Sequence, residues 1–363
     1  MDKEKILYIS HIDWNFIKQR PQFIAEGLEA YFDLSIYCIS SLKKCFQKRK
    51  ENVHPIFDVP KKNSNTVAHF FDVCIKKFVI RRAIRKANPE YIYLTFPTLF
   101  DYVPANYQGK IIYDCMDNHI GFHALDKNKK RVINSEQALV KRSDYVFFTS
   151  EKLKKEIISR YDFNEKKAFL NRNAYNGDCI DDKEFVTDKS KATKDFYIAY
   201  FGAIDKWFDF DMIQKSLDYF PNFKYLLIGP IGTEVKKLEN ERIEYTGAVP
   251  HSKLFEMTKH VDCFIIPFKI NELIESVDPV KIYEYINFNK NILCVYWAEL
   301  DRYKNFVHFY RDEQSFISTI QNLCNDRGVS FSNDKRKEFL GNNTWTIRCS
   351  QIVEILKAGN QSK

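Results

Sequence analysis

The stretch DPVKIYEY, residues 278–285, lies between an apolar run at Cys263–Phe268 and another at Ile292–Trp297. The two runs are typical of buried parallel strands, and the stretch between them is typical of the start of a helix. Asp278 suits an N-cap, and Pro279 suits the first helical turn. A strand–helix–strand unit of this kind predicts a doubly wound parallel sheet, in which ligands bind beyond the carboxyl ends of the strands.

Lys281 and Glu284 lie three residues apart at the start of this helix. A cation and helix-terminal amides suit a phosphate group, and a carboxylate suits the hydroxyls of a sugar. The pattern therefore indicates a site for a phosphorylated sugar. An ordinary capped helix that packs Ile282 and Tyr285 inward explains the same residues, and the spacing alone leaves both readings open.

Outward from this unit, short apolar runs alternate with helical patterns in two series. The expected strands are Ile6–Ser10, Leu34–Ile39, Tyr91–Phe96, Ile111–Met116, Tyr145–Ser150 and Ala168–Asn171, then Tyr197–Ile204, Tyr225–Pro230, Ile243–Val249, Cys263–Phe268 and Ile292–Trp297. Two such series predict an α/β protein with two Rossmann-like, doubly wound domains that face a cleft, at residues 1–175 and 195–340. The polar segment 178–194 is interpreted as a linker, and residues 312–358 are expected to be helical.

The composition limits the class of protein. The 363 residues are 45% hydrophobic, and no apolar run is long enough to span a bilayer. The sequence MDKEKILYIS enters a strand directly and has no signal-peptide core. Nine cysteines at irregular spacing, without a C-x-x-C pair, argue against a disulfide framework or a zinc site. We therefore expect a cytoplasmic protein.

The positive charge is concentrated in one region. Residues 43–86 hold 13 Lys or Arg against 3 Asp or Glu, in a chain whose net charge is +8. Within this region the stretch 69–86, HFFDVCIKKFVIRRAIRK, interleaves apolar and basic side chains. It predicts a basic amphipathic helix that contacts the inner face of the cell membrane. A domain helix with a solvated basic face is the alternative, and no motif for nucleic acid accompanies the charge.

Several residues at expected strand ends are candidates for binding a phosphate or a nucleotide. Gly202 permits close approach to a phosphate, and Lys206 adds a charge nearby. Val249, at the end of a later strand, is a candidate for lining a nucleotide pocket. Ordinary turns at these strand ends are the alternative for Gly202 and Val249 alike. The D-x-D pattern at Asp209 and Asp211 favours an N-cap over a metal site.

Polar residues also follow the expected strands of the first domain. Asp13 and Arg20 lie between the first strand and the first helix, where Arg20 is placed to reach a phosphate or carboxylate. Asp114, Asp117 and His119 end a later strand, and these residue types suit a base, an orienting group or a ligand for acceptor hydroxyls. Capping and turn formation explain Asp117 equally well.

Taken together, these segments resemble the two-domain GT-B glycosyltransferases, most nearly the family-4-like retaining group that builds bacterial surface polysaccharides such as lipopolysaccharide or capsule. The resemblance runs in collinear order over most of the chain. It rests on WNFIKQRPQFIAEGL (14–28), YDCMDNHIGF (113–122), FTSEKL (148–153), LNRNA (170–174), YFGAIDKWFDFDMI (200–213), LIGPI (227–231), YTGAVPHSKL (245–254), DPVKIYEYI (278–286) and NTWTIRCSQI (343–352).

The resemblance implies that the second domain binds a nucleotide sugar and that the first binds the acceptor. Residues 341–363 are expected to form a helix that returns toward the first domain. Glu284 matches the second glutamate of the E-x7-E motif and is expected to bind the donor ribose, whereas Ser276 stands where the first glutamate belongs. The candidates to replace this first glutamate are Asp278 and Glu275. The candidates to bind the diphosphate are Lys281, Lys206 and Arg20.

The resemblance further implies a retaining hexosyltransferase-like enzyme that needs neither a cofactor nor a metal. It would move a sugar from a nucleotide diphosphate, most simply a UDP-sugar, to a saccharide or lipid-linked saccharide acceptor. Two other functions stay open. A nucleotide-sugar epimerase shares the architecture, and a non-catalytic glycan-binding or scaffold protein would retain the fold without the chemistry.

Overall fold

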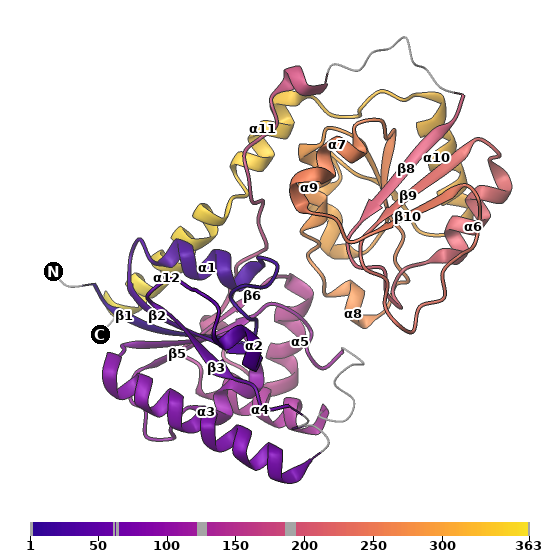
Figure 1. The fold of residues 1–363 in the computed structure, drawn as a ribbon. Coiled ribbons are helices and arrows are strands. Elements are labelled where there is room, and N and C mark those ends of the chain that lie inside the picture. The colour runs from indigo at the N-terminus through magenta and orange to yellow at the C-terminus, as the bar shows by residue number, and fades with distance from the viewer. Residues whose placement is uncertain (1–2, 61, 63–64, 122–128, 186–193, 362–363) are drawn as a thin grey trace. The chain divides into compact units, whose positions relative to one another are not determined.

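The computed structural model describes residues 3–60, 62, 65–121, 129–185 and 194–361. It divides the chain into two compact units. Unit 1 comprises residues 1–173 and 345–363, and unit 2 comprises residues 174–344 (Figure 1). Both ends of the chain therefore belong to unit 1, and each unit is described by itself below.

Unit 1 is built on a seven-stranded parallel sheet in the order β3-β2-β1-β4-β5-β6-β7. The chain enters at the middle of the sheet and builds outward first to one edge and then to the other, which is a doubly wound topology. Nearly all the side chains of β1, β4, β5 and β6 are buried, as expected for the central strands of a parallel sheet with helices on both faces. The strands are β1 (Lys5–Ser10), β2 (Asp33–Ser40), β3 (Val53–Phe57), β4 (Tyr91–Leu94), β5 (Lys110–Cys115), β6 (Tyr145–Phe148) and β7 (Ala168–Leu170).

The helices of unit 1 include one from the far end of the chain. In Figure 1, α12 (Trp345–Gln361, yellow) lies beside α1 (Arg20–Leu28). Trp345 stacks on Phe23 with ring centroids 5.1 Å apart, and the Asn171 amide donates to the Arg348 carbonyl at 3.0 Å. The other helices are α2 (Leu42–Cys45), α3 (Thr66–Ala87), α4 (Lys129–Arg142) and α5 (Glu151–Tyr161).

Unit 2 repeats the design with a six-stranded parallel sheet in the order β10-β9-β8-β11-β12-β13. Its core is rich in aromatic side chains; Phe264 stacks on Tyr285 with centroids 4.1 Å apart. The strands are β8 (Phe196–Phe201), β9 (Phe223–Ile228), β10 (Ile243–Gly247), β11 (Cys263–Ile266), β12 (Asn291–Val295) and β13 (His308–Tyr310). The helices are α6 (Phe210–Tyr219), α7 (Leu254–Thr258), α8 (Glu272–Glu275), α9 (Lys281–Asn287), α10 (Glu313–Asn325) and α11 (Asn333–Gly341).

The structure confirms the two parallel sheets and adds two strands that the sequence did not reveal. Both β3 and β13 lie at an edge of their sheet. An edge strand tolerates Pro55, and a three-residue strand leaves no clear apolar pattern.

Part of the segment interpreted as a linker is built into unit 2. The backbone amide of Ile180 donates to Asn287 Oδ1 at 3.1 Å, and Arg336 Nη2 donates to the Ile180 carbonyl at 2.9 Å. Tyr175 belongs to the buried core of the unit. Residues 186–193 of the proposed linker, and Phe122 of the resembling stretch at 113–122, lie outside the described residues.

None of the helices in the described part of the chain is both long enough and apolar enough to cross a bilayer.

Candidate functional site

The candidate donor site begins with two glycines at the carboxyl ends of β8 and β9. Gly202 has φ +134° and Gly229 has φ +141°, a backbone region that side chains rarely adopt. A Cβ on Gly229 would lie 2.0 Å from the Gly202 carbonyl oxygen, and a Cβ on Gly202 would lie 2.7 Å from Lys281 Nζ. Only glycine at both positions therefore lets the turns after β8 and β9 approach each other and lets the Lys281 ammonium approach Gly202.

Lys281, the first residue of α9, is held in an aromatic enclosure at this edge. Its ammonium donates to the Tyr200 hydroxyl at 2.6 Å and lies 4.2 Å from the centroid of the Tyr200 ring and 5.1 Å from that of Phe268. Burial lowers the pKa of Lys281 to about 7, although the negative charge of Glu284 opposes the shift. The charged form of Lys281 is therefore unfavourable at this buried position unless an anionic group pairs with it.

Glu284 lies one helical turn after Lys281 and binds His251, which follows β10. The carboxylate oxygen Oε1 contacts His251 Nε2 in a close hydrogen bond, and that bond raises the pKa of His251. Glu284 is about one-fifth exposed, whereas His251 is about two-thirds exposed. An exposed histidine therefore binds the carboxylate that we expected to bind a ribose.

The start of α9 differs from the expectation. Helix α9 begins at Lys281, and Asp278 does not cap it. Asp278 is buried and accepts a hydrogen bond from the Tyr303 hydroxyl at 2.9 Å. Ser276 is also buried, and its hydroxyl donates to the Leu273 carbonyl at 2.7 Å. The expected N-cap role of Asp278 was therefore wrong, because its carboxylate faces a long-range partner, and its role in donor binding stays a prediction.

The remaining donor-site candidates lie at the same end of the sheet with different surroundings. Lys206 is exposed and forms an ion pair with Glu234. Val249 is partly buried and packs against the core of unit 2. Asp209 accepts from the backbone amides of Asp211 and Met212 at 3.1 and 3.2 Å, so it caps α6 as the sequence indicated.

In unit 1, Arg20 and Asp114 bind each other in the interior. Arg20 Nε and Nη2 donate to the Asp114 carboxylate at 3.0 and 2.8 Å, and both side chains are almost fully buried. Arg20 also donates to Asn171 Oδ1 at 3.0 Å and to the Arg172 carbonyl at 3.1 Å. Protein groups thus satisfy this guanidinium, which ties α1 to the carboxyl ends of β5 and β7. The structure gives no support to Arg20 as a phosphate ligand or to Asp114 as a base.

Asp117 and His119 belong to a second cluster at the carboxyl edge of unit 1. The His119 ring lies 4.6 Å from the Phe96 ring and 6.2 Å from the His11 ring, measured between centroids. Burial lowers the pKa of His119 to about 3 and that of His11 to about 4, and it raises the pKa of Asp117 to about 7. At neutral pH both imidazoles are therefore uncharged, and Asp117 is half protonated.

One atom in this cluster lacks a partner. His119 Nε2 is buried and has no hydrogen bond within the described residues. In contrast, His11 Nδ1 lies 2.9 Å from Thr95 Oγ1. An unsatisfied buried polar atom costs free energy, so it is a good candidate for contact with a ligand.

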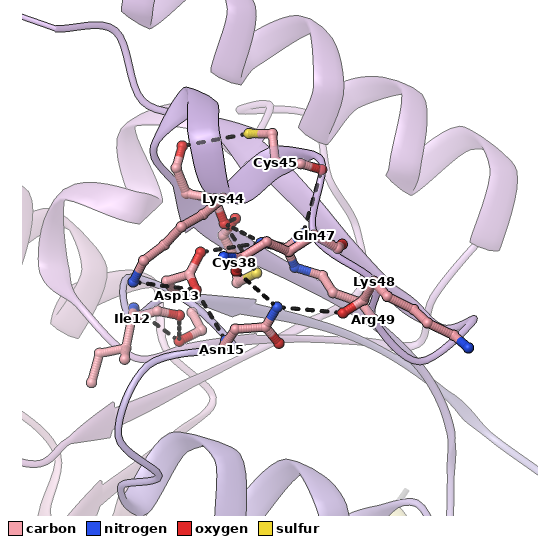
Figure 2. A network of polar contacts seen from close by, with 11 residues as sticks. Ile12, Asp13, Asn15, Cys38, Lys44, Cys45, Gln47, Lys48 and Arg49 are labelled. Atoms are coloured by element: carbon pink, nitrogen blue, oxygen red, sulfur yellow. Dashed lines mark hydrogen bonds and ion pairs between the residues drawn. The ribbon is translucent and has the colours of Figure 1, made fainter.

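Asp13 is engaged by its own neighbours. Arg49 Nη2 donates to Asp13 Oδ2 at 3.2 Å, Lys44 Nζ lies 3.7 Å from Oδ1, and the backbone N–H of Asn15 donates to Oδ1 at 3.0 Å (Figure 2). The carboxylate therefore joins the loop after β1 to the segment around α2. The structure gives no support to Asp13 as an acceptor or phosphate ligand, and that role stays a prediction.

Three residues of these sites were missed in the sequence. His251 follows the glycine that ends β10, and Tyr200 and His11 lie at or next to the ends of β8 and β1. A search for polar side chains at every strand end would have found them. Within the described residues, no group of three or more histidine, cysteine, aspartate or glutamate side chains is arranged to hold a metal.

Comparison with known proteins gives a consistent fold. The chain is 21% identical over 283 residues to TuaH of Bacillus subtilis strain 168, provisionally named a teichuronic acid biosynthesis glycosyltransferase; the match covers 72% of this chain and 70% of that protein. Sucrose-phosphate synthase from Thermosynechococcus elongatus superposes with a TM-score of 0.76 at 10% identity, covering 99% of this chain and 100% of its own. The chain has the GT-B glycosyltransferase fold. No protein-family model matches it.

Two further structures share this fold to different degrees. HepE from Anabaena, in complex with UDP and glucose, superposes with a TM-score of 0.69 at 11% identity, covering 98% of this chain and 99% of its own. A UDP-N-acetylglucosamine 2-epimerase from Rickettsia bellii gives a lower TM-score of 0.55 at 10% identity, covering 98% of this chain and 96% of its own. The expected resemblance to GT-B glycosyltransferases is confirmed, and the likeness to an epimerase is weaker.

Proposed function

We propose that this chain is a glycosyltransferase that moves a sugar from UDP to a saccharide or lipid-linked saccharide during synthesis of a surface polysaccharide. The observation that carries the proposal is the buried cation Lys281, set beneath Gly202 and one turn before Glu284 at the carboxyl edge of unit 2. The similarity to TuaH supports the reaction class, and the UDP bound to HepE supports the donor class.

In this proposal unit 2 binds the donor. The Lys281 ammonium binds the diphosphate, and the Glu284 carboxylate accepts hydrogen bonds from the ribose after releasing His251. During transfer the bond from the anomeric carbon to the diphosphate oxygen breaks and negative charge develops on the leaving UDP. A cation already fixed beside that oxygen stabilises the charge without reorganisation.

The acceptor side of the proposal rests on unit 1. The acceptor hydroxyl loses its proton as its oxygen bonds to the anomeric carbon, and half-protonated Asp117 has a pKa suited to accept a proton at neutral pH. Neutral His119 offers its free Nε2 to a sugar hydroxyl. Retention of anomeric configuration and independence from metal are part of the proposal.

The test is calorimetric titration of the whole chain with UDP, GDP, dTDP and CDP, with and without Mg²⁺. We expect selective binding of UDP that does not require the metal. Glu284→Ala should weaken this binding by about tenfold, the value of hydrogen bonds to a charged group. Glu241→Ala, which removes an exposed carboxylate of the same unit, is the matched control.

The competing functions give other outcomes. Conversion of a UDP-sugar into its epimer without an acceptor would replace the transferase proposal by an epimerase. Failure to bind any nucleoside diphosphate would favour a scaffold protein. Equal affinity in Glu284→Ala and Glu241→Ala would remove Glu284 from the site.

We also propose that α3 contacts an anionic membrane. Its Phe70, Phe71 and Phe78 are exposed, which a helix that packs only on the sheet would avoid. An open hollow of about 650 Å³ runs along the helix and is lined by Cys74, Lys77, Phe78, Arg81, Arg82, Arg85 and Lys86. The structure corrects one residue of the expected basic face: Lys76 is buried between Asp72 and Asp58, with 2.7 Å to each.

Co-sedimentation with vesicles tests this contact. Reversing the charges of Arg81, Arg82, Arg85 and Lys86 to glutamate should abolish binding to vesicles that contain phosphatidylglycerol, because each basic residue contributes about 1 kcal/mol near such a surface. Unchanged sedimentation would leave α3 as an ordinary surface helix.

A further inference from the structure

A second exposed apolar surface of unit 1 lies at the carboxyl ends of β1 and β2. Four large side chains there are mostly in solvent: Phe16 is 51% exposed, Ile17 72%, Leu42 55% and Phe46 84%. We call these four residues the loop surface. Phe16 and Ile17 follow β1, whereas Leu42 and Phe46 lie four residues apart on and just after α2, so that they share one side of a helical turn.

The loops that carry this surface are fixed to each other by polar contacts (Figure 2). Asn15 Nδ2 donates to Gln47 Oε1 at 3.1 Å and to the Lys48 carbonyl at 3.4 Å. Arg49 binds Asp13 at 3.2 Å and also donates to the hydroxyl of Ser40 at 3.2 Å. The Lys44 ammonium lies 5.1 Å from the centroid of the Phe16 ring, which joins the two loops at the surface itself.

This organisation sets the loop surface apart from scattered exposed side chains. A chain gains little by holding apolar groups in water on loops that polar contacts fix in place, unless the groups meet an apolar partner. Because the network orders both loops beforehand, a partner need not supply the free energy to order them.

The charge around the surface indicates the chemistry of that partner. Residues 42–50 hold Lys43, Lys44, Lys48, Arg49 and Lys50 and no carboxylate. Within the described residues, no carboxylate pairs with Lys43 or Lys48, and both side chains are exposed. Apolar tips rimmed by lysines suit a layer that is anionic at its surface and apolar beneath.

We propose that the loop surface inserts into an anionic phospholipid bilayer, with Lys43 and Lys48 at the lipid phosphates and Phe16, Ile17 and Phe46 among the acyl chains. The contact is separate from the one proposed for α3, since it depends on insertion of apolar tips rather than on a basic helix face. It is also independent of donor binding, whose residues belong to unit 2.

The experiment measures partition of the full chain onto phosphatidylcholine vesicles with and without phosphatidylglycerol. We expect Phe46→Ser to weaken partition onto the anionic vesicles by roughly tenfold, the value of one large apolar side chain, and the pair Phe16→Ser and Ile17→Ser to weaken it by roughly a hundredfold. Lys43→Glu with Lys48→Glu should reduce the preference for anionic over neutral vesicles. Tyr219→Ser removes a similarly exposed aromatic ring from unit 2 and should change nothing.

A second measurement reports insertion directly. In Phe46→Trp, brominated acyl chains should quench the added tryptophan fluorescence when the protein binds vesicles, and absence of quenching would overturn insertion. Partition equal to wild type in the serine variants would also overturn it. If these variants instead lower the mass of a wild-type oligomer in light scattering and bind vesicles normally, the partner is a second copy of the chain, and the proposal is wrong.

The substituted side chains are mostly in solvent, so the thermal unfolding midpoint should not fall. UDP affinity should also stay at the wild-type value in every loop variant. A normal affinity with lost partition separates failure of this surface from failure of the proposed function.

Discussion

At the scale of single residues, the buried ammonium of Lys281 links donor binding to pH. Its pKa is lowered to about 7, so most molecules hold a neutral Lys281 above that pH. A bound diphosphate favours the charged form, and binding must then take up a proton. In the free protein, the pKa of Lys281 is lower in the folded chain than in the unfolded chain. The free energy of unfolding therefore rises as the pH increases above about 7.

We therefore predict that UDP affinity falls as the pH rises from about 7.5 to 9, where the phosphates are already ionised. The slope should approach tenfold per pH unit, and buffers of different ionisation enthalpy should reveal the proton uptake in calorimetry. Lys281→Met should bind UDP weakly with a flat profile. Lys206→Met, which removes an exposed lysine nearby, should keep the slope; a slope that survives in Lys281→Met would contradict the assignment.

The pair Arg20–Asp114 predicts an effect on stability at a position that looked catalytic. Asp114→Asn would leave the Arg20 charge buried beside a neutral amide. We expect it to lower the free energy of unfolding by about 3–5 kcal/mol, which is typical when one partner of a buried pair is removed. Asp117→Asn in the same loop should cost far less, because Asp117 already carries a proton in half of the molecules at neutral pH. Urea denaturation measures both, and equal losses would contradict the distinction.

At the scale of elements, the contact between α1 and α12 depends on a glycine. A Cβ on Gly27 would lie 2.3 Å from Cys349 Sγ and 3.0 Å from its Cβ, so the two helices meet where α1 has no side chain. Cys349, Ile352 and Leu356 on α12 are buried there. The last residues of the chain therefore complete the core of the first unit.

Gly27→Ala should separate these helices and lower the free energy of unfolding by about 1–3 kcal/mol, as overpacking does elsewhere. The double variant Gly27→Ala with Cys349→Ala removes the clashing sulfur and should recover part of the loss. Denaturation of both single variants and the double variant gives the coupling. Additive losses would show that the two residues do not meet.

At the scale of the whole molecule, the limits of sequence reasoning follow from the range of each interaction. Apolar runs are local, so they predicted the central strands of both sheets, while the edge strands β3 and β13 left too little pattern. Strand ends and the pair Lys281 and Glu284 were also local, and they led to the proposal of a site at the carboxyl edge of the sheet in unit 2. Partner choice is long-range: Arg20 finds Asp114 across 94 residues, and Glu284 finds His251 across 33. No spacing rule predicts such pairs, so the sequence did not reveal the partners of these candidate residues.

The division of the chain into two units predicts which peptides a bound nucleotide protects from hydrogen exchange. A ligand that binds only the folded state stabilises it by about 2.7 kcal/mol at a hundredfold excess over its Kd. If UDP binds at Gly202, Lys281 and Glu284, hydrogen exchange should slow in peptides from the ends of β8 and β9 and from α9. Peptides from the core of the first sheet, such as β5, should exchange as before. Lys281→Met at the same UDP concentration should lose most of this protection, which ties it to the site. Protection confined to residues 5–170 would instead place the nucleotide in unit 1 and assign the neutral His11–His119 cluster, not Lys281, to the donor.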